Sequence, residues 1–171
     1  MTTEAAGSPV GGSGTHLLFR RQAQLFAVSV VDVTEMIEIP ETTRVPAAAS
    51  VVVGVINHHG DILPVLNINT LLDITNTTNQ PLTTGTIGFI VGEGEGRMVV
   101  PIDATLGLVL LPPEGEHGEG LIQKTVVVED QVIAVLDVDL LMSTVETAVT
   151  GAWQDTTISA EYQQLRDHKG E

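Results

Sequence analysis

The sequence predicts a mainly β fold made of two small β-barrels packed against each other, with a few short helices. Three observations lead to this fold class. Short apolar runs rich in Val and Ile alternate with turns of Gly, Pro and acidic residues, which is the pattern of strands joined by tight loops. Two other segments carry Leu at helical spacing after an Asn or Asp. A residue pattern in the first half of the chain is also repeated in similar form in the second half.

Nine apolar runs are predicted to be strands. They cover residues 17–19, 25–31, 51–56, 62–66, 87–91, 98–102, 106–111, 125–128 and 132–136. Between them, GEGEGR (92–97) is expected to be a turn, PPEGEHGEG (112–120) an exposed loop and TNTTNQPLTTG (75–85) a linker. The chain has one Trp, one Tyr and three Phe, so its core is predicted to be aliphatic.

Two short helices are predicted at 67–73 (NINTLLD) and 137–147 (DVDLLMSTVET). Each segment begins with Asn or Asp, whose side-chain oxygen can accept a hydrogen bond from a free backbone N–H of the first helical turn. Each then continues with Leu at helical spacing, which favours a helix with one buried face.

The ends of the chain differ in composition from the patterned middle. Residues 1–15 are mostly Gly, Ser, Thr and Ala, and we expect a disordered leader because they cannot bury enough apolar surface to offset ordering. The folded domain is expected over 16–148. The remaining residues, 149–171, are expected to form a tail that holds a short helix at 158–168.

An internal repeat links the two halves. PVLNINTLL (64–72) aligns with AVLDVDLLM (134–142), and AVSV (27–30) aligns with VVPI (99–102). The match includes the capping Asn and Asp, which favours a true repeat over chance similarity between β-rich sequences. A lobe of about 65 residues is marginal alone. We therefore expect two packed lobes, at roughly 16–80 and 81–148, with Leu66 and Leu136 as equivalent buried positions.

Charge and composition exclude several function classes. The formal net charge is −15, from 22 acidic and 7 basic residues, which argues against binding to nucleic acid or to an anionic membrane surface. The chain has no Cys, which excludes disulfides and thiolate metal sites. It has neither an apolar run of about 20 residues nor a secretory signal pattern, so we expect a cytoplasmic protein without direct membrane insertion.

Four motifs follow one another along the chain: LFRRQAQLFAVSVVDVTEMIEI (18–39), RVPAAASVVVGVINHHGDILPVLNINTLL (44–72), MVVPIDATLGLV (98–109) and VIAVLDVDLLM (132–142). Their order resembles the CheW-like family of chemosensory adaptors. The second motif is the most specific, since it carries the family pattern of G-V-I-N, a turn Gly and I-x-P-V. The resemblance runs from about residue 17 to residue 142.

The resemblance implies two five-stranded SH3-like barrels and an adaptor without catalytic activity, cofactor or metal. It implies two partners. One side would bind the regulatory domain of a CheA-type histidine kinase, and the groove between the lobes would hold the cytoplasmic helical hairpin of a chemoreceptor. The partner-binding residues that it implies are Val33, Glu35, Met36, Gly54, Asn57, His59 and Gly60.

Several of these residues also have a structural interpretation. Val33 and Met36 could belong to the core, and Gly54 and Gly60 could serve backbone shape, with Gly60 in a hairpin turn. Two positions depart from the family pattern: His59 replaces the usual Arg, and Asn67 replaces the usual Asp. His59 is expected to face a carboxylate, either on a partner or on Glu35 of this chain.

Two other hypotheses remain. The chain could keep the fold but serve other partners, in a pilus-motility, cyclase-output or array-partition system. A metal-dependent hydrolase using His58, His59 and Asp61 is the least favoured. Adjacent residues of a strand point to opposite faces, so the two histidines are not expected to bind one ion.

Overall fold

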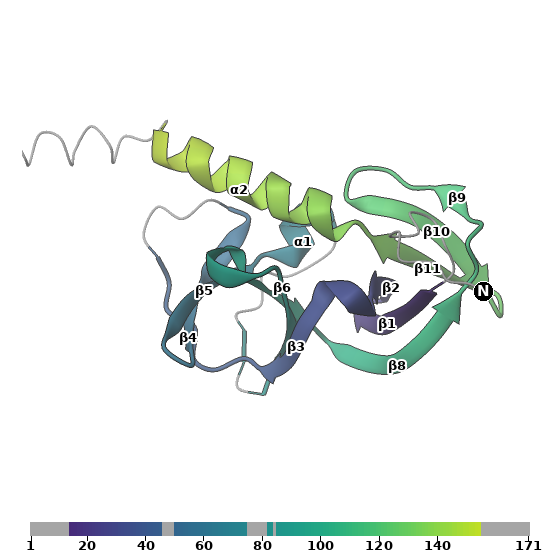
Figure 1. The fold of residues 1–171 in the computed structure, drawn as a ribbon, viewed down its shortest axis with the longest axis horizontal. Coiled ribbons are helices and arrows are strands. Elements are labelled where there is room, and N and C mark those ends of the chain that lie inside the picture. Colours follow the sequence, from purple (N-terminus) through teal and green to yellow (C-terminus); the bar gives the residue numbers. More distant parts are fainter. Residues whose placement is uncertain (1–13, 46–49, 75–81, 84, 155–171) are drawn as a thin grey trace, which may run out of the picture.

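A computed structural model describes residues 14–45, 50–74, 82–83 and 85–154. The fold is mainly β, with two packed sheets and a long helix that runs along one side (Figure 1). The predicted fold class is therefore confirmed. Among the described residues there is no helix long and apolar enough to cross a membrane.

The first sheet has six strands in the order β8-β1-β2-β11-β10-β9. Its strands are β1 (Gly14–Arg21), β2 (Gln24–Ser29), β8 (Ala104–Leu111), β9 (Glu116–His117), β10 (Ile122–Val128) and β11 (Gln131–Leu136). Neighbours are antiparallel except for β2 and β11, which run parallel. The sixth strand, β9, has only two residues and lies in the segment predicted to be a loop.

The second sheet has five strands in the order β3-β6-β7-β5-β4. They are β3 (Val33–Glu38), β4 (Val52–His58), β5 (Asp61–Leu66), β6 (Ile87–Val91) and β7 (Met98–Ile102). The chain beyond β3 turns back across the sheet, and Thr43 forms an isolated bridge with Val55 of β4. The segment that follows β3 at one edge of the sheet therefore lies beside β4 at the other edge.

The sheets do not follow the two halves of the sequence. The expected lobes at 16–80 and 81–148 are wrong as sheet boundaries, since β1 and β2 pair with β8 to β11 and the second sheet runs from β3 to β7. Strand partners are chosen by long-range packing, which local sequence patterns do not encode. The repeat itself is present, because β5 pairs in parallel with β7 just as β11 pairs with β2.

Both predicted helices follow the repeated strands. Helix α1 (Ile68–Leu71) starts after Asn67, whose Oδ1 accepts from the Thr70 N–H at 3.4 Å. Helix α2 (Val138–Gln154) starts after Asp137, whose Oδ1 accepts from the Leu140 N–H at 3.0 Å. Helix α2 extends into the residues expected to form the tail. The helix expected at 158–168 and residues 1–13 of the expected leader lie outside the described residues.

The core lies mostly between the two sheets, because alternate residues of each central strand point to opposite faces. On β7, Met98 and Val100 enter the shared core, whereas Val99 packs inside the five-stranded sheet. Phe19 of β1 meets Phe89 of β6 across this shared core, with ring centroids 5.3 Å apart. Helix α2 adds Leu141 and Val145 to the same cluster. The core is aliphatic apart from its three Phe residues, as expected.

Two strands, β3 and β9, were not predicted from the sequence, and the structure shows why. Strand β3 contains Glu35 and Glu38, which interrupt its apolar pattern because this strand faces solvent along most of its length. Strand β9 is held by pairing with β10 rather than by its own composition. Gly14 and Thr15, which were assigned to the leader, begin β1 and pair with β8.

Candidate partner-binding site

Most of the predicted partner-binding residues gather at one end of the five-stranded sheet. Strand β3 carries Val33, Glu35 and Met36, and the hairpin between β4 and β5 carries Asn57, His59 and Gly60. Gly54 lies farther along β4. The structure therefore brings together an edge strand and a hairpin turn that are distant in sequence.

The hairpin turn is shaped by its own residues. His59 and Gly60 have positive φ values of 53° and 91°, as two-residue hairpin turns of this hand require at both central positions. Asn57 supports the turn, since its Oδ1 accepts from the Gly60 N–H at 2.9 Å. The interpretation of Gly60 as a turn residue is correct. His59 is a residue type that tolerates this left-handed conformation better than most.

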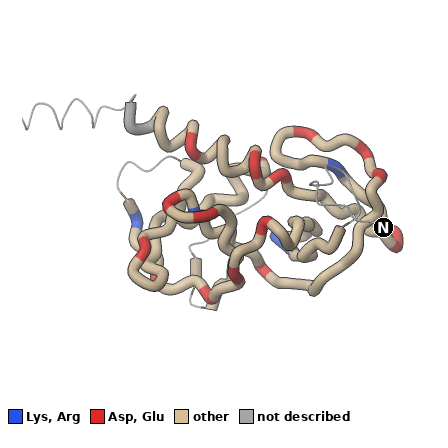
Figure 2. The backbone as a smooth tube through the Cα atoms, viewed as in Figure 1, with Lys and Arg blue, Asp and Glu red and all other residues tan. Residues whose placement is uncertain are grey.

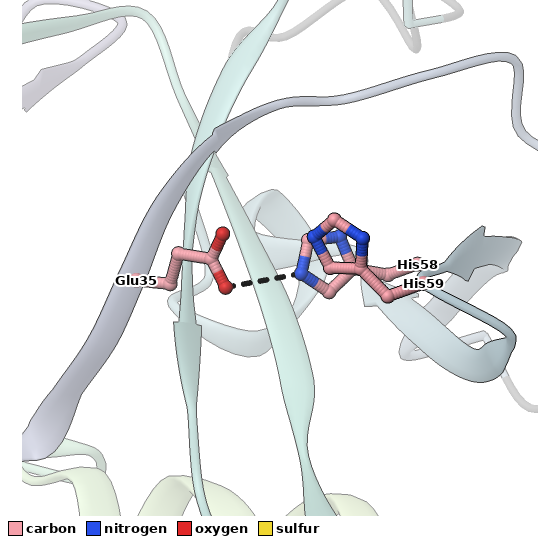
Figure 3. A group of neighbouring side chains, drawn as sticks. All are labelled: Glu35, His58 and His59. Atoms are coloured by element: carbon pink, nitrogen blue, oxygen red, sulfur yellow. Dashed lines mark hydrogen bonds and ion pairs between the residues drawn. The ribbon is translucent and has the colours of Figure 1, made fainter.

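Glu35 is bonded to His58 rather than to His59. His58 Nε2 lies 3.0 Å from Glu35 Oε2, across the two edge strands that the barrel brings together (Figure 3). His59 was expected to face a carboxylate on a partner or on Glu35; it lies in one group with Glu35, whose hydrogen bond goes to the neighbouring His58, and the contact with a partner carboxylate stays a prediction. Because His59 lies in the turn with a positive φ, its ring comes to the same side as that of His58, with ring centroids 4.1 Å apart. The two rings therefore do not point to opposite faces, as strand alternation had predicted.

Gly54 is buried, and its role in the fold is structural. A Cβ atom at this position would collide with the backbone oxygen of Thr43, in the segment that bridges to β4. Only glycine permits this close approach between two backbones. Val33 is half-buried and packs against the shared core, whereas the side chain of Met36 is exposed.

The sequence profile of the CheW-like domain matches residues 15–146. The chain belongs to the CheW-like family. Its fold is similar to the crystal structure of the scaffolding protein TtCheW from Thermoanaerobacter tengcongensis, with a TM-score of 0.61 and 17% sequence identity. The similarity covers 79% of this chain and 90% of that one. A search of curated proteins finds no match to the chain.

Membership in the CheW-like family bears on the question of catalysis. CheW-like proteins are scaffold adaptors without enzymatic activity, so this chain is not an enzyme. The carboxylate of Asp61 pairs with Arg97, and the acidic side chain that lies beside the two histidines is Glu35.

The surface of this CheW-like chain also holds apolar side chains that the sequence analysis did not single out. Ile62, next to the hairpin turn, is 62% exposed, and Val132 is 60% exposed at the equivalent position of the β10–β11 hairpin. Strand β8, at the edge of its sheet, exposes Leu106, Leu108 and Leu110 in a row. Alternation along TLGLVLL could have indicated an exposed face on β8, but burial of one face cannot be assigned without knowing the neighbouring elements.

Charge on this CheW-like chain is spread over both sheets and α2, with acidic positions far outnumbering basic ones (Figure 2). The pKa of one acidic group, the carboxyl of Asp32, is raised above its ordinary value. Partial burial raises the pKa of its carboxyl, and the negative charges of Asp139 and Asp137 at the start of α2 raise it further, while His16 opposes them. Asp32 directly precedes β3, so this charge cluster lies between α2 and the edge strand.

Proposed function

We propose that this chain is a chemosensory scaffold that couples receptors to a CheA-type histidine kinase. The observation that carries the proposal is the CheW-like domain over residues 15–146. A solved structure with a similar fold is that of a scaffolding protein, which supports the same role. A scaffold of this kind acts through contacts: it holds the kinase where a receptor can bias the equilibrium between kinase states.

The end of the five-stranded sheet suits the kinase contact. It combines the exposed apolar side chains of Met36 and Ile62 with polar groups on Glu35 and Asn57. Interfaces of this type join apolar anchors to a polar rim. We assign this surface to the regulatory domain of the kinase, with Ile62 as an anchor beside the predicted residues.

The exposed leucines of β8 suit the receptor contact. Leu106, Leu108 and Leu110 are all exposed on an edge strand, and exposed apolar side chains gathered in this way mark a protein-binding surface. The apolar face of an amphipathic helix is complementary to such a surface. The cytoplasmic helical hairpin of a chemoreceptor supplies a helix of this type, and binding to it would keep the chain in the cytoplasm at the receptor array.

The kinase contact is tested by calorimetric titration of the chain with the cognate regulatory domain. Ile62→Ser is expected to weaken binding by at least about tenfold, since removing an interface anchor costs about 1–2 kcal/mol or more. Val132→Ser is the matched control, because Val132 is equally exposed at the equivalent position of the other hairpin. Equal losses in both variants would contradict the assignment of this surface to the kinase.

The receptor contact is tested in the same way with a receptor hairpin fragment. Leu108→Ser is expected to weaken binding, whereas Val127→Ser, at similar exposure on β10, is not. A second candidate function is the same fold with other partners, which the replacement of the usual Arg by His59 favours. Absence of binding to the kinase domain, together with binding to a component of a pilus-motility or cyclase system, would support that candidate instead.

A further inference from the structure

We propose that Glu35, His58 and His59 form a binding site for a divalent transition-metal ion of the zinc class. One ligand atom from each side chain can be chosen so that all three lie within 4.8 Å of one another. Figure 3 shows the carboxylate of Glu35 directed from β3 toward the two imidazole rings of the hairpin. The side chains come from the two edge strands of one sheet and from the turn that follows β4.

The ligand set fits this class of ion. Imidazole nitrogen and carboxylate oxygen are common zinc ligands, and three protein ligands leave a fourth position for water or for a group on another molecule. Two ligands of a tetrahedral zinc ion, each about 2.0–2.1 Å from the metal, lie about 3.3 Å apart. His58 Nε2 and Glu35 Oε2 are already 3.0 Å apart, so a small separation of these two atoms admits the ion.

The backbone places the histidines for this role. His58 is the last residue of β4, and its side chain is only 11% exposed, while the Glu35 side chain is 44% exposed. His59 occupies the first left-handed position of the turn, which takes it out of the strand alternation. As a result, the two rings lie side by side with centroids 4.1 Å apart and planes at 58°. The site is therefore anchored on one side and open on the other.

The turn geometry by itself does not require histidine. The equivalent β10–β11 turn adopts the same left-handed conformation with Glu129 and Asp130, at φ 50° and 66°. The nearby Asp61 carboxylate is engaged by Arg97 and does not compete for the histidines. The high negative charge of the whole chain also favours the approach of a cation.

A simple ion pair between Glu35 and His58 is the alternative to a metal site. Such a pair needs neither the imidazole of His59 nor a metal, so substitution of His59 separates the two. His59→Asn keeps a residue that tolerates the left-handed turn but removes the imidazole ligand. His117→Gln is the control, since His117 is an exposed histidine on β9 outside the group.

The experiment is calorimetric titration of the full chain with zinc chloride. The wild-type chain and the His117→Gln variant are expected to bind one equivalent with the same affinity. His59→Asn and Glu35→Gln are expected to bind at least about tenfold more weakly, because each loses a direct ligand and the loss of even an outer-shell partner costs about tenfold or more. Unchanged affinity in His59→Asn, or no binding to the wild-type chain, would overturn the proposal.

Thermal unfolding with and without zinc gives a second readout. An ion that binds only the folded chain raises the melting temperature by mass action. The rise is expected in the wild-type chain and in His117→Gln, and it is expected to be lost in His59→Asn. Equal melting temperatures of all variants without zinc would confirm that the substitutions leave the fold intact. A zinc-dependent rise of the same size in His59→Asn would overturn the assignment of that residue as a ligand.

Discussion

Ala27 of β2 and Val135 of β11 are register partners in a parallel strand pair that joins the beginning of the folded chain to its last strand. The equivalent pair in the other sheet is Val65 of β5 with Val99 of β7. Both pairs follow the alignment of the internal repeat. Both sheets therefore combine strands from the two halves of the repeat: the five-stranded sheet is continuous in sequence from β3 to β7, whereas the six-stranded sheet joins β1 and β2 to β8–β11.

The repeat predicts equal energetic roles for Leu66 and Leu136. Both leucines are buried in the shared core, at 0% and 3% exposure. Each change to Ala is expected to lower the free energy of unfolding by about 2–5 kcal/mol, through lost burial and the cavity left behind. Urea unfolding of both variants measures this, with the exposed Leu110→Ala as control. If either core variant unfolds like the wild type, the equivalence of the two positions is wrong.

Gly54 is predicted to tolerate no side chain. The added Cβ of Gly54→Ala would strike the Thr43 backbone, and the bridge between Thr43 and Val55 would have to open. A stability loss of about 1–3 kcal/mol is expected, as for other overpacked sites. Gly151→Ala in α2 is the control: it has open space around it and should gain up to about 1 kcal/mol from helix propensity. Both changes are measured by chemical denaturation, and a neutral Gly54→Ala would contradict the close approach.

Lys124 is predicted to stabilise the loop that follows β8, through hydrogen bonds to its backbone. Its side chain is buried, and its Nζ donates to the carbonyl oxygens of Pro112 and Pro113, each at 3.0 Å. Lys124→Met keeps much of the apolar stem but removes both charged hydrogen bonds, so a loss of about 1–3 kcal/mol is expected. Hydrogen exchange should also quicken at the β9–β10 pairing. Unchanged exchange there would show that the loop is held by other contacts.

Asp32 is predicted to make stability fall as pH rises. Its pKa is raised in the folded chain, so the folded state binds the proton more tightly than the unfolded state does. The charged carboxylate therefore penalises folding in full above the raised pKa, and the penalty is lost as pH falls through that pKa toward the ordinary value. Asp32→Asn is expected to raise the melting temperature near neutral pH, with a gain that shrinks on acidification.

The control for this pH dependence is Glu146→Gln, which removes one exposed negative charge from α2. It separates the local effect at Asp32 from the general effect of lowering the net charge. A gain for Asp32→Asn that stays constant down to acidic pH, or that Glu146→Gln reproduces, would contradict the assignment of the raised pKa to burial and to the charges of Asp137 and Asp139.

The elements that the sequence predicted well are those encoded by neighbouring residues. The hairpin strands 62–66 and 132–136 were predicted within a residue or two, because their apolar runs are bounded by turn residues. The helix starts at Asn67 and Asp137 were correct, since a capping side chain bonds only a few residues along the chain. The family motifs are also short stretches of neighbouring residues, and they were sufficient to identify the CheW-like domain.

Only the tertiary structure decided which strands share a sheet and which side chains meet across it. β2 pairs with β1 of its own half on one side and with β11 of the other half on the other side, because burial of both faces of each central strand selects long-range partners. Glu35 reaches His58 because the edge strands of one sheet curl together, and His59 joins them through a left-handed turn. These contacts depend on how the five-stranded sheet curls and on the backbone conformation of the turn at His59. No spacing of residues in the sequence determines either of them.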